Sequence, residues 1–129
     1  GVEGGGSPPP AVNQIESHAR FAQKDLVQYC ESRGILVTAY GSVGAKGLRA
    51  DTTVQAIAAK HKRTPAQISL RHTLSRQGGS MAVLTKSVTT KRVAENALAF
   101  EFELDADDMT AMDALDTGTR SYWDNSEVT

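Results

Sequence analysis

Three short apolar segments, each followed by polar or glycine-rich residues, constrain the fold of this chain more than any other feature. They occupy residues 11–16, 35–40 and 81–84. The second is a β-branched run that ends at Gly41, as expected of a buried strand. Helical apolar spacing occupies residues 23–33, 51–61, 64–77, 89–100 and from 105 onward. Strands that alternate with helices in this way form parallel sheets with right-handed crossovers, so we predict an α/β fold with three parallel strands flanked by helices.

Local signals mark where these helices begin and end. Short side chains with oxygen acceptors precede four of them and are predicted N-caps: Asp51, Thr64, Thr89 and Asp105. Pro65 suits a first helical position, and Gly34 suits the left-handed residue that follows a helix. In the helix over residues 89–100 we expect the apolar side to face inward, namely Val93, Ala94, Ala97 and Leu98.

The composition fits one folded domain and excludes several classes of protein. The chain has 129 residues, of which 40% are hydrophobic, and 14 Lys+Arg against 15 Asp+Glu leave a net charge of -1. This balance argues against binding to nucleic acid by bulk charge, and no apolar run is long enough to cross a membrane. The single cysteine, Cys30, has no intramolecular partner, which predicts a reducing compartment, the cytoplasm. His18, His61 and His72 lack metal-ligand spacing, so we predict no metal site.

The first ten residues differ in composition from the rest. They are rich in glycine, serine and proline, which is typical of a flexible linker, so we assign the folded domain to residues 11–129. The chain begins at Gly1 and not at Met. This start indicates a trimmed, engineered or fragmentary chain.

Cationic and hydroxyl side chains follow the third strand, at the edge of a parallel sheet where ligands bind. Lys86 comes directly after the strand, and Ser87 and Thr89 lie where the next helix begins. A helix N-terminus with nearby cations suits a phosphate group, and Arg92, one turn into the helix, could hold the same phosphate. The alternative is a solvated strand end with an ordinary N-cap.

The first two strands also end in candidate ligand contacts. Tyr40 precedes a loop of small residues, so its ring could stack on a flat cofactor or pack on its own loop. Gln14 alternates with Ile15, so Gln14 and Glu16 are predicted to share the working face of the sheet. A buried glutamine needs a partner, which is either a ligand amide or a neighbouring strand.

Several segments, taken in order, resemble the aldo-keto reductase family. They are Val-Asn-Gln-Ile-Glu at 12–16, Gly-Ile-Leu-Val-Thr-Ala-Tyr at 34–40, Thr-Pro-Ala-Gln-Ile-Ser-Leu-Arg at 64–71, Lys-Ser-Val-Thr from 86 with Glu-Asn at 95–96, and the stretch 102–115. The resemblance implies a (β/α)8 TIM barrel that reduces aldehydes and ketones with NADPH. It places the three strands as the sixth, seventh and eighth of that barrel, so we expect a partial TIM-barrel-like unit from its C-terminal part.

The resemblance also implies a set of NADP(H)-binding residues. Gln14 would bond the nicotinamide carboxamide, Tyr40 would stack on the nicotinamide ring, and the Ser42 loop would lie along the pyrophosphate. Contacts to the 2′-phosphate fall on Lys86, Ser87 and Arg92, and contacts to adenine fall on Glu95 and Asn96. The family's catalytic Asp, Tyr, Lys and His lie on its first four strands, which have no counterpart here. No catalytic residue is therefore assigned. Of this chain alone we expect NADP(H) binding that is weak or lost, without reductase activity.

Three parallel strands leave two open sheet edges, so we expect self-association, with a carbonyl substrate bound only if a complete barrel is assembled. Two other functions stay open. Residues 53–75 also imitate a helix-turn-helix with a local basic surface, formed by Lys60, Lys62, Arg63, Arg71 and Arg76. Salt-dependent DNA binding would support that alternative. A non-catalytic interaction or oligomerisation module would bind neither NADPH nor DNA.

Overall fold

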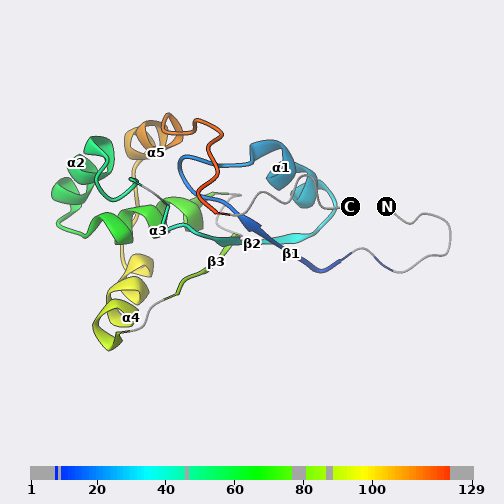
Figure 1. Ribbon diagram of the computed structural model, residues 1–129, viewed down its shortest axis with the longest axis horizontal. Coiled ribbons are helices and arrows are strands. Elements are labelled where there is room, and N and C mark those ends of the chain that lie inside the picture. Colours follow the sequence, from blue (N-terminus) through cyan, green and yellow to red (C-terminus); the bar gives the residue numbers. More distant parts are fainter. Residues whose placement is uncertain (1–7, 9, 46, 77–80, 87–88, 123–129) are drawn as a thin grey trace.

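The protein folds around a three-stranded parallel sheet. A computed structural model describes residues 8, 10–45, 47–76, 81–86 and 89–122. The sheet has the order β1-β2-β3, formed by β1 (Val12–Glu16), β2 (Leu36–Tyr40) and β3 (Ala82–Leu84) (Figure 1). Its register places Glu16 beside Tyr40, and Tyr40 beside Leu84. The carboxyl ends of the three strands therefore lie together at the same end of the sheet. The predicted α/β fold with three parallel strands is confirmed.

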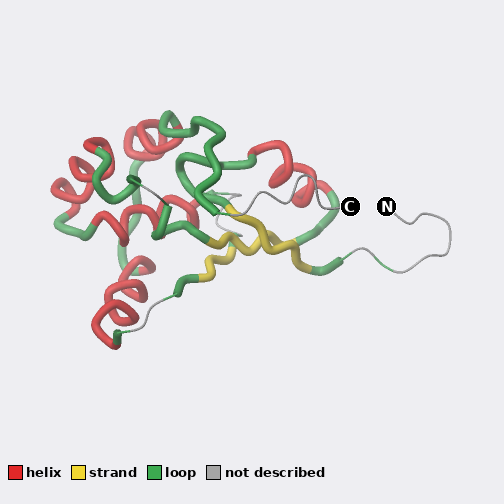
Figure 2. Tube along the Cα trace, in the orientation of Figure 1, coloured by secondary structure: helices red, strands yellow, loops and turns green. Residues whose placement is uncertain are grey.

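Helices follow each strand in the predicted order. They are α1 (Lys24–Ser32), α2 (Thr52–His61), α3 (Pro65–Ser75), α4 (Thr90–Ala97) and α5 (Ala106–Asp113), with a short 3-10 helix, η2 (Leu98–Phe100). Figure 2 shows the strands together at the centre, with α2, α3 and α5 gathered at one end of the sheet. The third helix ends two residues earlier than expected, because the backbone of Arg76 is extended.

The predicted helix caps are all in place. The Asp51 carboxylate accepts a hydrogen bond from the Thr53 amide at 2.9 Å. Thr64 and Gln67 bond each other's backbone amides in a reciprocal capping box, and Asp105 and Asp108 do the same at α5. Thr89 accepts from the Arg92 amide, and Gly34 has the expected left-handed conformation, with φ at 68°. These signals lie within a few residues of the helix ends that they define.

Two apolar clusters hold the helices to the sheet. One joins α1 to the strands, with Ile15, Val27, Cys30, Ile35, Val37, Ala39 and Met81 buried. The other joins the loops after β1 and β2 to α2, α3 and α5, with Ala19, Ala45, Leu48, Val54, Ile57, Ala58, Ile68 and Met112 buried. Cys30 is a buried free thiol. In the part of the chain that the structure describes, no helix is long and apolar enough to cross a membrane.

The prediction that the apolar side of α4 faces inward is wrong. Val93 is 56% exposed and Phe100, just beyond the helix, is 71% exposed. Ala94, Ala97 and Leu98 are exposed as well. Figure 1 shows α4 set apart from the other helices, and its contacts run to α3 and η2. Its apolar side faces α3 and β3 across a shallow groove of about 220 Å³, lined by Leu70, Leu74, Val83, Val93 and Phe100, and does not pack closely against them.

The chain returns to the end of β1 after α5. We call residues 114–122 the C-terminal segment. Its Thr117 and Thr119 amides donate to the Arg20 carbonyl at 3.2 and 3.1 Å. Its Ser121 and Tyr122 amides donate to the Glu16 carboxylate. The segment therefore covers the carboxyl end of the first strand. The predicted linker falls almost wholly outside the described residues, which begin at 8 and 10.

Candidate functional site

A cavity of about 850 Å³ opens where β2 and β3 end. Its walls come from the loop after β2, the N-terminal end of α3, the two residues directly after β3, and α4 itself. Tyr122 adds a contribution from the C-terminal segment. These elements meet because parallel strands end at the same sheet edge and their following loops converge there.

The structure brings most of the predicted site residues to this cavity. It is lined by Tyr40, Ser42, Lys86, Arg92, Glu95 and Asn96. Gln14 does not line it, and Ser87 lies outside the described residues. The cavity thus collects side chains from three elements that are far apart in sequence.

The prediction that Gln14 is a buried amide is wrong. Gln14 is exposed, while Glu16, two residues along the same strand, is only 2% exposed. The difference arises because the C-terminal segment covers the end of the strand, where its amides bond Glu16, and leaves Gln14 open. Glu16 also bonds the buried His18 ring at 2.9 Å, so this carboxylate is occupied by the protein itself.

Tyr40 meets a second tyrosine at the cavity. The rings of Tyr40 and Tyr122 lie edge to face, with centroids 6.0 Å apart. Tyr122 also lies over the glycine loop after β2. A Cβ added at Gly41 would come within 2.6 Å of the Tyr122 ring, and one added at Gly44 would overlap its hydroxyl. The two glycines therefore allow the C-terminal segment to approach the loop closely.

Ser42 connects the loops after the first two strands. Its side chain is buried, and its hydroxyl donates to the Ser17 carbonyl at 3.1 Å. A phosphate oxygen can only accept hydrogen bonds at neutral pH, and this hydroxyl proton is already used. Ser42 therefore positions the loop along the cavity wall rather than donating its side-chain proton to an anion.

The charge at the cavity is predominantly positive. Three exposed cations line it: Arg49, Lys86 and Arg92. Across the described ranges, none of their side chains has a hydrogen-bond or ion-pair partner. The single carboxylate on the wall, Glu95, lies 4.0 Å from the Lys91 ammonium. An anion is therefore the ligand charge that this cavity suits.

The wall that carries Arg92 and Glu95 is fixed to the rest of the protein through α3. The buried Gln67 donates its side-chain amide to the Glu95 carbonyl at 2.9 Å. This bond holds α4 at the cavity although its apolar side is exposed. Within the described ranges no group of three or more His, Cys, Asp or Glu side chains is arranged to hold a metal ion.

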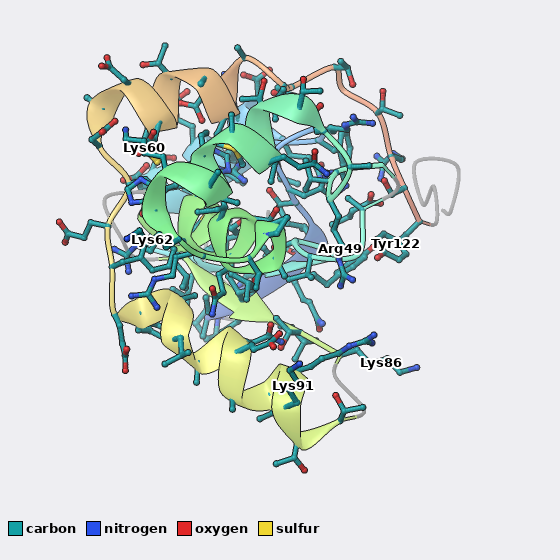
Figure 3. All side chains as sticks on the ribbon, turned by 90° about the vertical axis from the view of Figure 1, so that its left-hand side faces the viewer. Arg49, Lys60, Lys62, Lys86, Lys91 and Tyr122 are labelled. Carbon is teal, nitrogen blue, oxygen red and sulfur yellow. The ribbon has the colours of Figure 1, made fainter. Side chains whose placement is uncertain are left out.

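Two cavity residues, Arg49 and Tyr122, were missed by the sequence reasoning. Arg49 lies at the end of the glycine-containing loop after β2, and Tyr122 lies near the end of the described chain. Figure 3 shows both on the same side of the molecule, above Lys86. The sequence offers only their residue types, a cation and an aromatic ring, as a sign of ligand binding. No local pattern indicates that these two segments reach the same cavity.

Known proteins are similar to this chain in sequence and in fold. The model of the aldo/keto reductase family matches residues 3–117. Dihydrodiol dehydrogenase 3 of Bos taurus is 38% identical over 122 residues, covering 86% of this chain and 37% of the bovine protein. MGS-M4, an aldo-keto reductase enzyme from a Medee basin deep-sea metagenome library, aligns over 97% of this chain and 47% of its own, with a TM-score of 0.88 and 31% identity.

A mutant of Gox0644, solved in complex with NADPH, aligns over 93% of this chain and 44% of its own, with a TM-score of 0.84 and 40% identity. The chain thus spans less than half the length of each of these relatives. Its fold superposes on part of their structures, in agreement with a partial TIM-barrel-like unit. Since the family model covers most of the sequence, the chain belongs to the aldo/keto reductase family.

Proposed function

We propose that this chain is the NADP(H)-binding C-terminal part of an aldo-keto reductase, with strands six to eight of its barrel. One observation carries the proposal: six residues predicted to contact the cofactor line one cavity whose cations lack partners in the described structure. The alignment with a relative solved in complex with NADPH supports it.

The cavity fits the parts of this cofactor by their chemistry. Lys86 and Arg92 would hold the 2′-phosphate by charge, and Tyr40 offers a half-buried ring for the nicotinamide. Glu95 and Asn96 would contact the adenine from α4. Ser42 would keep its loop along the pyrophosphate through its bond to Ser17. Gln14, which is exposed and outside the cavity, would reach the carboxamide only if the ring extended toward β1.

Bound NADPH supplies a hydride for carbonyl reduction in this family, and the residues of this chain would bind and orient it. No tyrosine here is proposed as the proton donor. Tyr29 lies on α1 beneath the Arg33 guanidinium, and Tyr40 and Tyr122 pack on each other. We therefore expect no reduction by this chain alone. We also expect weak NADP(H) binding, because a flexible cofactor loses entropy when it is ordered in an open cavity.

A fluorescence titration with NADPH tests this function. Lys86→Ala and Arg92→Ala should each weaken binding about tenfold, because each removes a charge-assisted contact to phosphate. Arg33→Ala, which removes an exposed arginine directly after α1 and outside the cavity, serves as the matched control and should bind like the parent. Equal binding by all four proteins would refute the assigned phosphate contacts.

The helix-turn-helix alternative has no support from the comparisons, and the structure uses several of its basic residues elsewhere. Lys60 bonds Asp105 and Asp108. Arg63 stacks on the Phe102 ring, and Arg76 bonds Ser17 and the Ala22 carbonyl. A non-catalytic interaction module stays the remaining alternative, and the absence of NADPH binding would favour it. The cytoplasmic location predicted from Cys30 stays a prediction.

A further inference from the structure

We infer that Arg49 is a further ligand-binding residue of this cavity and that it takes the diphosphate of a dinucleotide. The inference rests on the proposed function for the identity of the ligand. It adds a third cation, from the β2–α2 loop, to the two that the family resemblance assigns to the 2′-phosphate.

The first observation is that Arg49 has no structural use for its charge. Its side chain is exposed, lines the cavity and has no bond within the described part of the chain. Other arginines are engaged: Arg20 bonds the Asp51 carboxylate at 3.1 Å, and Arg76 bonds the Ser17 hydroxyl at 2.8 Å. Arg49 is therefore available to a ligand at little cost to the fold.

The second observation is that the backbone carrying Arg49 is held in place. The preceding Leu48 is fully buried in the core. Its carbonyl accepts from the Asp51 amide at 3.2 Å, and the Arg49 carbonyl accepts from the Gln55 side chain at 3.4 Å. The guanidinium thus projects from an anchored loop, which lowers the entropy lost when it binds an anion.

The third observation is the distribution of charge. Lys86 and Arg92 lie on the wall formed by the end of β3 and α4, whereas Arg49 lies on the wall formed by the loop after β2. Figure 3 shows Arg49 above Lys86 in the same view. A ligand with two anionic groups can bind the cations of both walls at once. A dinucleotide with a 2′-phosphate has them, and its diphosphate matches the two-pronged guanidinium of an arginine.

Calorimetric titration of the full chain with NADPH, NADH, 2′-AMP and inorganic pyrophosphate tests the inference. NADH and pyrophosphate contain the diphosphate without the 2′-phosphate, and 2′-AMP contains the 2′-phosphate without the diphosphate.

Arg49→Ala should weaken the binding of NADPH, NADH and pyrophosphate about tenfold and leave the binding of 2′-AMP unchanged. Arg92→Ala should weaken the binding of NADPH and 2′-AMP and leave the binding of pyrophosphate unchanged. The diphosphate affinity of Arg49→Lys should lie between those of the parent and of Arg49→Ala, because lysine keeps the charge and loses the two-pronged hydrogen bonding of the guanidinium. Arg33→Ala is the control.

The outcomes separate this inference from the proposed function. NADPH binding that Arg49→Ala leaves unchanged, or an equal loss of 2′-AMP, would overturn the role of Arg49 while the proposed function stands. Pyrophosphate binding that depends on Arg49, without NADPH binding, would overturn the proposed function and retain the diphosphate site. Binding of none of the four probes would overturn both.

Discussion

The carboxylate of Glu16, at the end of the first strand, accepts a hydrogen bond from the Ser121 amide at 2.5 Å across 105 residues of sequence. Tyr122 donates to the other carboxylate oxygen at 3.3 Å. This buried contact holds the C-terminal segment against the sheet edge where the candidate cofactor cavity opens. It also places the Tyr122 ring over the glycine loop of that cavity.

Glu16→Ala should destabilise the protein by about 3 kcal/mol, because it leaves two backbone donors and the buried His18 ring without their acceptor. Glu16→Gln keeps one oxygen acceptor and should lose less. Urea unfolding measures both. Glu31→Ala, on the exposed side of α1, should stay within about 0.5 kcal/mol of the parent. A loss for Glu16→Ala no larger than for Glu31→Ala would contradict the anchoring role.

Asp108 should make the stability fall in acid. Burial alone would raise the pKa of Asp108, but hydrogen bonds from His61, Lys60 and the Asp105 amide outweigh it and lower this pKa to about 2. The folded pKa is below the unfolded one. The carboxylate therefore contributes roughly 2 kcal/mol above about pH 4, and this is lost as the pH falls toward 2.

Urea unfolding of the parent and of Asp108→Asn between pH 7 and pH 2 measures this contribution. The free-energy difference between the two proteins should be largest at neutral pH and should shrink as the pH falls from 4 to 2. The difference curve removes the contribution of Asp113, another carboxylate with a lowered pKa, which both proteins share. A difference that is constant with pH would show that Asp108 does not titrate as proposed.

The two glycines under Tyr122 should respond differently to alanine. Gly41 has φ at 82°, so Gly41→Ala should cost about 1 to 2 kcal/mol from backbone strain as well as the overlap with the ring. Gly44→Ala meets only the Tyr122 hydroxyl and should cost less. In a Tyr122→Ala background, thermal unfolding should show that the Gly44→Ala cost disappears and that most of the Gly41→Ala cost remains. Costs unaffected by Tyr122→Ala at both positions would argue against this packing.

Self-association stays a prediction, and the exposed apolar side of α4 sharpens it. Val93 and Phe100 are 56% and 71% exposed beside the open edge of β3, and a second copy would bury them. Light scattering should give a mass above 13.8 kDa at micromolar concentration, and Val93→Glu with Phe100→Asp should reduce it. Lys62→Glu, which changes the charge of an exposed residue at the end of α2, is the control. A clean monomer of the parent protein would overturn the prediction.

Much of the fold is predictable from neighbouring residues. The strands, their parallel order and the caps at Asp51, Thr64, Thr89 and Asp105 all follow from local patterns. Hydrogen bonds in a cap join residues two or three positions apart, so the sequence contains both partners. The family motifs extend this reach, since by their order and spacing they predict Tyr40, Lys86 and Arg92 as site residues, and all three line the cavity.

The sequence by itself therefore determined the elements, their order and the family. Only the tertiary structure decided which side chains meet. Gln14 is exposed and Glu16 is buried, although both lie on one strand, because a segment more than a hundred residues later covers one of them. Arg49 reaches the same cavity as Arg92 for a similar reason. Burial and proximity depend on the packing of distant segments, which no local pattern specifies.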